Sequence, residues 1–242
     1  MTPGQARGRF TTTRWTMVAA AGHPSNAGAA GALAELCQIY WPPLYGYLRG
    51  RGYGAEEARD LTQGFFARLL ERQDLRSADQ ARGRFRGFLL TALKRYVINE
   101  HERAASARRG GLHTRFPLDF EEAERAYSRE RRNDDTPERV FDRKWAAIAL
   151  DRALQRLREE YQEAGKGRAA DLLLPYLTDA GELPAYRDAA ASLDLSEGAV
   201  KVAVHRLRQR FGAILRLEIS ETVLGPDDVE KEMRELLRAV SA

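Results

Sequence analysis

The sequence predicts an all-α protein in which two small helical domains are joined by a linker. Leu occurs 29 times in the 242 residues, Val 9 times and Ile 5 times. Leu favours helices, whereas β-branched residues favour strands. The chain has no Val/Ile-rich run that would suit a buried parallel strand. Apolar residues recur instead at the three- and four-residue spacing of amphipathic helices.

Composition excludes several classes of protein. Hydrophobic residues make up 43% of the chain, which is enough to build a core. No apolar run approaches the roughly 18 residues of a membrane-spanning helix, so we expect no membrane partner. The single cysteine, Cys37, excludes an intramolecular disulfide and a Cys-rich zinc site, and its helical surroundings place it in the core. Because no signal peptide is evident, we expect a cytoplasmic protein.

The first predicted element is a helix that starts near Leu33. It follows residues 1–28, whose Gly, Pro, Thr and Ser content predicts a flexible N-terminal segment. Apolar residues at i, i+3, i+4 and i+7 define one face of this helix. Pro42 and Pro43 interrupt the pattern, so the sequence leaves open one kinked helix or two helices, ending near the glycines of 50–54.

Two further helices complete the first domain, which we place at residues 29–109. One helix is expected over 55–71 and a longer one over 85–108, each with an apolar stripe. A polar loop at 72–83 separates them, and a Gly-Gly pair ends the longer helix.

An acidic linker is expected at residues 110–138, because this segment lacks a sustained apolar stripe and ends in a run of Asn, Asp, Thr and Pro. A short helix over 120–130 is compatible with its sequence. The second domain is expected at 139–217, where periodic apolar residues resume. Its predicted helices cover about 137–164, 169–177, 184–192 and 197–217.

Charge is distributed unevenly along a chain whose net charge is only +4. Residues 72–115 carry 11 basic and 4 acidic side chains, and residues 200–217 carry 5 basic and no acidic ones. The segments 119–139 and 218–242 are net acidic. A solvated helix face explains any single basic block, but two such blocks on helical segments favour nucleic-acid binding.

The second basic block lies in a predicted helix-turn-helix. A short helix meets a tight turn at Asp194 and Leu195, and Ser196 is a good N-cap for the helix that follows. That helix combines a buried apolar row with an outer face carrying Lys201, His205 and Arg208. In a helix-turn-helix the second helix lies in the major groove of DNA. The alternative is an ordinary αα-hairpin with a solvated basic face.

Aromatic residues alternate with arginines just before the long helix of the first domain, in the segment RGRFRGF at 82–88. This composition suits single-stranded DNA, whose exposed bases stack on aromatic rings beside cationic groups. The alternative is that Phe85, Phe88 and Tyr96 belong to the core.

No set of catalytic or metal-binding residues is evident. The four histidines share no spacing used by zinc sites, and the Gly-rich segments lack the strand–loop–helix context of a phosphate-binding loop. We therefore expect a non-enzymatic protein without cofactor, metal or small-molecule substrate, and these observations argue against a nuclease.

Three segments occur in the order DLTQGFFARLL (60–70), FRGFLLTA (85–92) and SEGAVKVAVHRLR (196–208). Together they resemble the bacterial sigma-70 family of RNA polymerase subunits, and the two-domain layout resembles its extracytoplasmic-function (ECF) subgroup. The resemblance covers about residues 30–108 and 140–217. It implies a sigma factor that binds core RNA polymerase and directs promoter recognition and melting. A helix-turn-helix regulator without polymerase docking is the alternative.

The resemblance also implies which residues bind. Residues 29–109 correspond to sigma region 2 and residues 139–217 to sigma region 4, with core RNA polymerase and promoter DNA as partners and an anti-sigma factor as a further candidate. Gly64 departs from the family pattern, which usually has an acidic residue there. The implied polymerase-binding residues are Asp60, Gln63, Phe66 and Leu70; the −10 DNA-binding residues are Arg84, Phe85, Lys94, Arg95, Asn99 and Arg103; the −35 DNA-binding residues are Ser196, Lys201, Val202, His205 and Arg206.

A C-terminal acidic extension at residues 218–242 lies beyond the usual end of the family. A helix is expected over 227–239, with an apolar stripe formed by Val229, Met233, Leu236 and Leu237. Two roles remain open for it. The helix either packs on the second domain as a structural element or covers the basic helix at 200–217 and restrains DNA binding.

Overall fold

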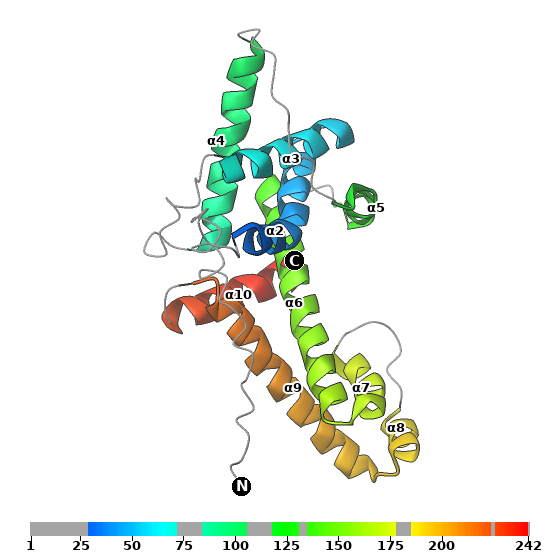
Figure 1. Ribbon diagram of the computed structural model, residues 1–242. Helices are drawn as coiled ribbons and strands as arrows, with labels where there is room; N and C mark the ends of the chain where they lie inside the picture. The colour runs from blue at the N-terminus through cyan, green and yellow to red at the C-terminus, as the bar shows by residue number, and fades with distance from the viewer. Residues whose placement is uncertain are drawn as a thin grey trace. The chain divides into compact units, whose positions relative to one another are not determined.

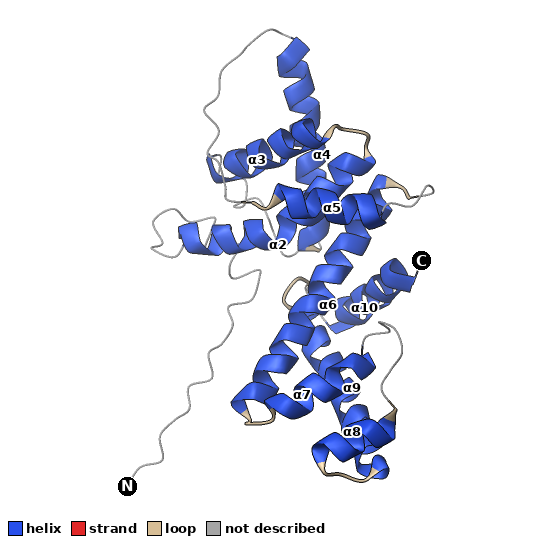
Figure 2. Ribbon diagram, turned by 90° about the vertical axis from the view of Figure 1, so that its right-hand side faces the viewer, coloured by secondary structure: helices blue, strands red, loops and turns tan. Residues whose placement is uncertain are grey.

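The computed structural model is helical wherever it describes regular structure (Figures 1 and 2), which confirms the all-α prediction. The expected flexible segment at 1–28 and the expected polar loop at 72–83 lie outside the described residues. These residues are 29–71, 84–105, 118–130, 135–177, 185–223 and 226–241.

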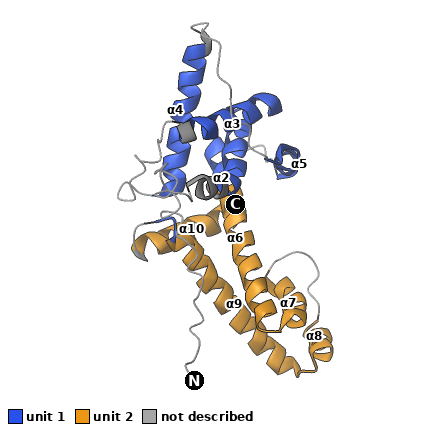
Figure 3. Ribbon diagram, viewed as in Figure 1, with its two compact units in different colours: residues 1–141, 221–224 blue, residues 142–220, 225–242 orange. Residues whose placement is uncertain are grey.

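The chain divides into two compact units, drawn in different colours in Figure 3. Unit 1 comprises residues 1–141 together with the short segment 221–224. Unit 2 comprises residues 142–220 and 225–242. The division falls inside one long helix, α6 (Pro137–Glu163).

Three helices form the core of unit 1: α2 (Ala29–Gly50), α3 (Ala55–Glu71) and α4 (Phe85–Ala105). Their bounds agree closely with the helices expected from the apolar periodicity. Aromatic rings join them, because Tyr40 of α2 meets Phe85 of α4 edge-to-face at 5.1 Å between ring centroids. The buried side chains of this core include Cys37, Tyr40, Leu44 and Leu48 of α2, Ala58, Phe65 and Leu69 of α3, and Phe85, Leu89 and Leu93 of α4.

The helix α2 continues through Pro42 and Pro43, so a single helix is the correct one of the two alternatives. The neighbouring Trp41 and Leu44 are buried, and this packing offsets the hydrogen bonds that proline cannot donate. The helix ends where Gly52 adopts a φ of +94°, a conformation that favours glycine.

The acidic segment expected to be a linker contains a helix, α5 (Phe120–Glu130), that packs on α2 within unit 1. Phe120 lies 4.8 Å from the ring centroid of Trp41 and 5.4 Å from that of Tyr45. Arg49 and Tyr45 donate hydrogen bonds to the carboxylate of Glu124 at 2.6–2.8 Å. This part of the segment is therefore attached to the first helical core.

Unit 2 contains most of α6 followed by α7 (Gly167–Leu173), the 3₁₀ turn η3 (Leu174–Leu177), α8 (Tyr186–Leu193), α9 (Glu197–Ser220) and α10 (Pro226–Ser241). The single helix expected over 169–177 is thus divided into α7 and η3. Pro175 has no N–H to donate to the preceding turn, so the α-helix does not continue through it. The buried side chains of this unit include Trp145, Ala149, Leu157, Leu173, Val204 and Leu207.

Candidate nucleic-acid interface

The segment predicted to be a helix-turn-helix folds as two helices, α8 and α9, joined by a tight turn. Asp194 adopts the left-handed conformation with a φ of 55°, and the N–H of Leu195 donates to the carbonyl of Ala190 at 3.0 Å. The Oγ of Ser196 accepts the N–H of Ala199 at 3.1 Å, which confirms Ser196 as the N-cap of α9. Because this hydroxyl caps the start of α9, the role that the structure gives Ser196 is to fix the geometry of the turn.

One face of α9 anchors it in unit 2. Val200, Val204, Leu207 and Ile214 are at most 2% exposed, as the predicted apolar row requires, and Phe211 is half-buried. These residues recur every three or four positions, and α9 contacts α7, η3, α8 and α10 within unit 2. The opposite face of the helix is consequently left for solvent or a ligand.

The outer face of α9 carries four residues predicted to contact DNA: Lys201, Val202, His205 and Arg206. All four are exposed, Val202 to 50%. Cationic side chains suit phosphates and guanine edges, and an exposed aliphatic group suits the methyl group of thymine. The structure therefore brings these residues together in the N-terminal half of α9.

Two other basic residues of α9 bind acceptors within unit 2. The guanidinium of Arg208 donates to the carbonyl of Tyr176 at 3.1 Å. Arg210 forms two hydrogen bonds of 2.7 Å with the carboxylate of Glu160 on α6. The basic block of the sequence is thus divided between an outward-facing part and a part that holds the domain together.

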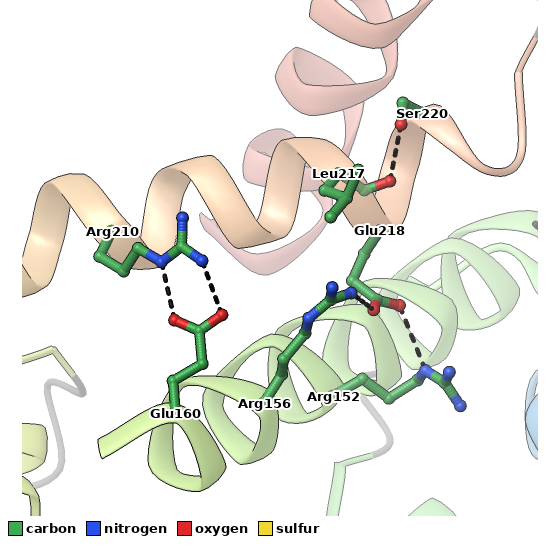
Figure 4. A network of polar contacts seen from close by, with 7 residues as sticks. All are labelled: Arg152, Arg156, Glu160, Arg210, Leu217, Glu218 and Ser220. Carbon is green, nitrogen blue, oxygen red and sulfur yellow. Dashed lines mark hydrogen bonds and ion pairs between the residues drawn. The ribbon is translucent and has the colours of Figure 1, made fainter. Parts of the chain in front are cut away.

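A second set of ion pairs fixes the C-terminal half of α9 against α6 (Figure 4). The carboxylate of Glu218 is 7% exposed and lies 3.3 Å from Arg152 and 3.5 Å from Arg156. A buried carboxylate requires such partners. The two helices are antiparallel, since the pairs run from Arg152 with Glu218 to Glu160 with Arg210. This bracing fixes the direction in which α9 presents its outer face.

The polymerase-binding residues predicted on α3 do not share one exposed face. Asp60 is exposed and Gln63 is half-buried, whereas Phe66 is only 1% exposed. The ring of Phe66 packs in the core, with its centroid 5.4 Å from that of Phe65, so its contact with polymerase stays a prediction. The side chain of Leu70 lies outside the described residues.

A cavity of about 420 Å³ lies beside Asp60 and Gln63 within unit 1. Residues 118–121, at the start of α5, form its other wall. Sequence reasoning placed this segment in a linker, so it did not identify these residues as neighbours of the α3 surface. Only the tertiary packing of α5 on α2 brings them there.

The predicted −10 residues of α4 fall into two groups. Phe85 is 1% exposed and Tyr96 6% exposed, so both rings lie in the core, and a contact of Phe85 with −10 DNA stays a prediction. Burial raises the pKa of Tyr96 to about 12. Lys94 is half-buried; its ammonium group lies 2.8 Å from Glu138, and that hydrogen bond raises the pKa of the lysine. Arg103 pairs with Glu100 at 2.6 Å.

The remaining residues of this group, together with neighbours that sequence reasoning missed, form the outer face of α4. Arg95 is exposed, and Arg84 and Asn99 are half-exposed. Thr91 and Ile98 share this face at four- and three-residue spacing from Arg95, and Ile98 is 57% exposed. The exposure of Ile98 could have been predicted from the sequence, because Ile98 does not fall at the three- or four-residue spacing that continues the buried row of Leu89 and Leu93.

The C-terminal extension packs on α9 through α10, beside the end of α9 that lies away from α8 (Figure 1). Met233 and Leu236 are buried as expected, but Leu237 is 52% exposed. Glu230 forms an ion pair of 2.9 Å with Arg216. The residues at the start of α9 that are predicted to contact DNA stay exposed with α10 in place, so the structure favours the packing role over the covering role.

This all-helical fold, with an exposed basic helix presented by a tight turn, is typical of a DNA-binding protein. A family model described as ECF sigma factor matches residues 49–216, well over half of the chain. The chain belongs to the ECF sigma factor family, which gives it a sigma factor role in transcription initiation. Core RNA polymerase and promoter DNA are the partners of that family.

Other comparisons add no relative: no curated protein and no solved structure matches the chain. No helix within the described ranges has the length and apolarity needed to cross a membrane. Nor do the described residues contain a group of three or more His, Cys, Asp or Glu side chains arranged to hold a metal ion.

Proposed function

We propose that this chain binds core RNA polymerase through the surface around Asp60 and Gln63 on α3 and directs the enzyme to promoters. In this proposal α9 binds duplex DNA at the −35 element, and the outer face of α4 binds the melted strand at the −10 element. The chain acts by binding alone, and the polymerase carries out the covalent chemistry.

The observation that carries the proposal is the exposed outer face of α9 within a chain that belongs to the ECF sigma factor family. Lys201, Val202, His205 and Arg206 lie in the N-terminal half of the second helix, which is the part that contacts base edges in helix-turn-helix proteins. The Ser196 cap and the ion pairs to α6 hold that helix in a defined direction.

The outer face of α4 supports a separate role with single-stranded DNA. Arg95 supplies a cation and Asn99 an amide that can bond to base edges, while Ile98 supplies an exposed apolar surface. Stacking and apolar contacts with unpaired bases, combined with cationic groups near the backbone, are typical of single-strand binding. Such a surface is needed by a protein that stabilises melted DNA.

Run-off transcription tests the proposal. Purified core polymerase is incubated with genomic DNA fragments, with and without the protein, and the 5′ ends of the transcripts are sequenced. We expect discrete start sites only when the protein is present, with two shared sequence elements upstream of them. Absence of protein-dependent start sites, combined with binding to duplex DNA, would support a regulator that does not dock on polymerase.

A further inference from the structure

The turn that follows α9 belongs structurally to unit 1. Residues 221–224 group with unit 1, whereas α9 and α10 on either side of them group with unit 2. We call Glu221–Val223 the capping turn. Its side chains are buried, with Thr222 and Val223 each 2% exposed and Glu221 8% exposed. The turn is thus part of the interior of unit 1.

The capping turn satisfies the first backbone donor of α4. The carbonyl of Thr222 accepts the N–H of Phe85 at 3.3 Å. The first N–H groups of a helix have no partner within the helix, and a buried donor without a partner costs free energy. Phe85 is 1% exposed, so the capping turn supplies a bond that water could not easily provide.

The next residue of α4 is a buried arginine. Arg86 is 8% exposed, an unusual degree of burial for an arginine, and it is engaged in polar or electrostatic contacts. Glu221 and Thr222 are engaged in such contacts as well. Buried polar and charged side chains therefore accompany the backbone bond at the capping turn and at the start of α4.

The capping turn holds α4 without covering its outer face. Thr91, Arg95 and Ile98 remain exposed in the presence of the turn, and Asn99 remains half-exposed. A segment that blocked DNA binding would have to bury these residues. The geometry therefore favours support of the helix over inhibition of it.

The capping turn lies outside the part of the chain that matches the family. The family match ends at residue 216, and the turn begins at residue 221. Whatever the turn contributes is therefore supplied by the extension rather than by the matched region.

We propose that the capping turn is a positioning element for the −10 surface: it fixes the first turn of α4, and with it Arg84 and the outer face of the helix, in the orientation that the melted strand requires. This inference rests on the proposed function of α4. It assigns to the C-terminal extension a role in reading the −10 element, in addition to the packing of α10 on α9.

A triple substitution in the full-length chain, Glu221→Gly with Thr222→Ser and Val223→Gly, tests the inference. Holoenzyme is assembled from core polymerase and each variant. It is then bound to a fork-junction DNA from a promoter mapped by run-off transcription, with a duplex −35 element and a single-stranded −10 element. Each element is also scrambled in a separate template. The discrimination ratio for an element is the affinity for the intact template divided by the affinity for the template in which that element is scrambled. The matched control is Lys231→Ala with Arg234→Ala, two exposed residues of α10.

We expect −10 discrimination to fall about fivefold to tenfold in the triple variant, because the buried side chains that hold the carbonyl of residue 222 against Phe85 are lost and the bond weakens. Discrimination at −35 should change less than about twofold, and the control should match wild type in both ratios. Hydrogen exchange should show faster exchange of the Phe85 amide. A purely structural role would lower thermal stability while leaving −10 discrimination intact at temperatures well below unfolding.

Unchanged or improved −10 discrimination would overturn the inference while leaving the proposed function standing, since wild type would still direct transcription. If the triple variant loses both ratios together, the milder Val223→Ala decides in the same assay: selective loss at −10 supports the positioning role, and any other result overturns it. Failure of the wild-type chain to direct transcription would instead refute the proposed function itself.

Discussion

Replacing Glu218 by Gln should destabilise unit 2 by about 1–3 kcal/mol. Removing one member of a fully buried ion pair costs about 3–5 kcal/mol, whereas exposed pairs contribute about 0–1 kcal/mol. Glu218 is 7% exposed, but Arg152 and Arg156 are 34% and 30% exposed. The arginines can therefore recover part of their hydration when the carboxylate is gone, and the expected loss lies between the two limits.

Thermal unfolding followed by circular dichroism measures this loss. For a domain of about 100 residues, 1 kcal/mol shifts Tm by about 4–8 °C, so we expect a decrease of roughly 4–24 °C. The matched control is Glu160→Gln. Its partner Arg210 lies closer, at 2.7 Å, but these two side chains are 32% and 55% exposed. We expect the control to lose at most about 1 kcal/mol.

The comparison separates burial from distance as the source of stability. If distance decided the strength of these pairs, Glu160→Gln would be the more harmful substitution. A Glu218→Gln variant no less stable than the Glu160→Gln variant would refute the reasoning. Binding of the −35 duplex below Tm should be retained in both variants, because neither residue lies on the outer face of α9.

Three further predictions concern binding and pH. Arg206→Ala should weaken −35 binding by about 1–3 kcal/mol at one base position if the guanidinium is bidentate to guanine, measured by anisotropy on duplexes with single base changes. If Arg206 contacts phosphate only, the loss should be uniform across sequences, and wild-type affinity would contradict both readings. Asp60→Arg combined with Gln63→Ala should weaken binding to core polymerase with little effect on Tm, whereas Phe66→Ala should lower stability by about 3–4 kcal/mol. If the Asp60→Arg, Gln63→Ala double variant lowered Tm as much as Phe66→Ala does, α3 would have no docking surface separate from its core face. Hydrogen bonding from Arg49 lowers the pKa of Glu124, so its contribution to stability is present above the ordinary carboxyl pKa of about 4.3 and is lost as pH falls through the lower folded value. Tryptophan fluorescence should report this acid transition for α5, and Glu124→Gln should abolish it; an unchanged transition in that variant would assign it to another group.

The helices and the helix-turn-helix were predictable because their signals are local. The bounds of α3 follow from its apolar period and the flanking glycines, and Ser196 caps α9 as its residue type suggests. Contacts between distant parts of the chain left no comparable signal. The packing of α5 depends on Glu124 meeting Arg49, 75 positions earlier, and the cap on α4 is a backbone carbonyl, which any residue could supply.

Two of the residues predicted to bind lie in the core, for a different physical reason. Phe66 and Phe85 lie in segments whose resemblance to the sigma-70 family implies binding, and both side chains are buried. A binding helix needs a core face as well as an outer face, and a segment carries both in the same run of residues. The resemblance identified the helices correctly, but only burial separates the residues that support the surface from those that form it.

The same distinction limits how strongly α9 should bind DNA through charge. Residues 200–217 carry five basic side chains, which together would predict a slope of about −4.5 for log K against log salt on duplex DNA. Three of them, Arg208, Arg210 and Arg216, bond to acceptors within unit 2. Lys201 and Arg206 are the basic residues of this block on the exposed −35 surface, so we expect a slope near −2 on an isolated −35 duplex. A slope near −4.5 would mean that the ion pairs to Glu160 and Glu230 open when DNA binds, and Glu160→Gln would then strengthen binding at low salt.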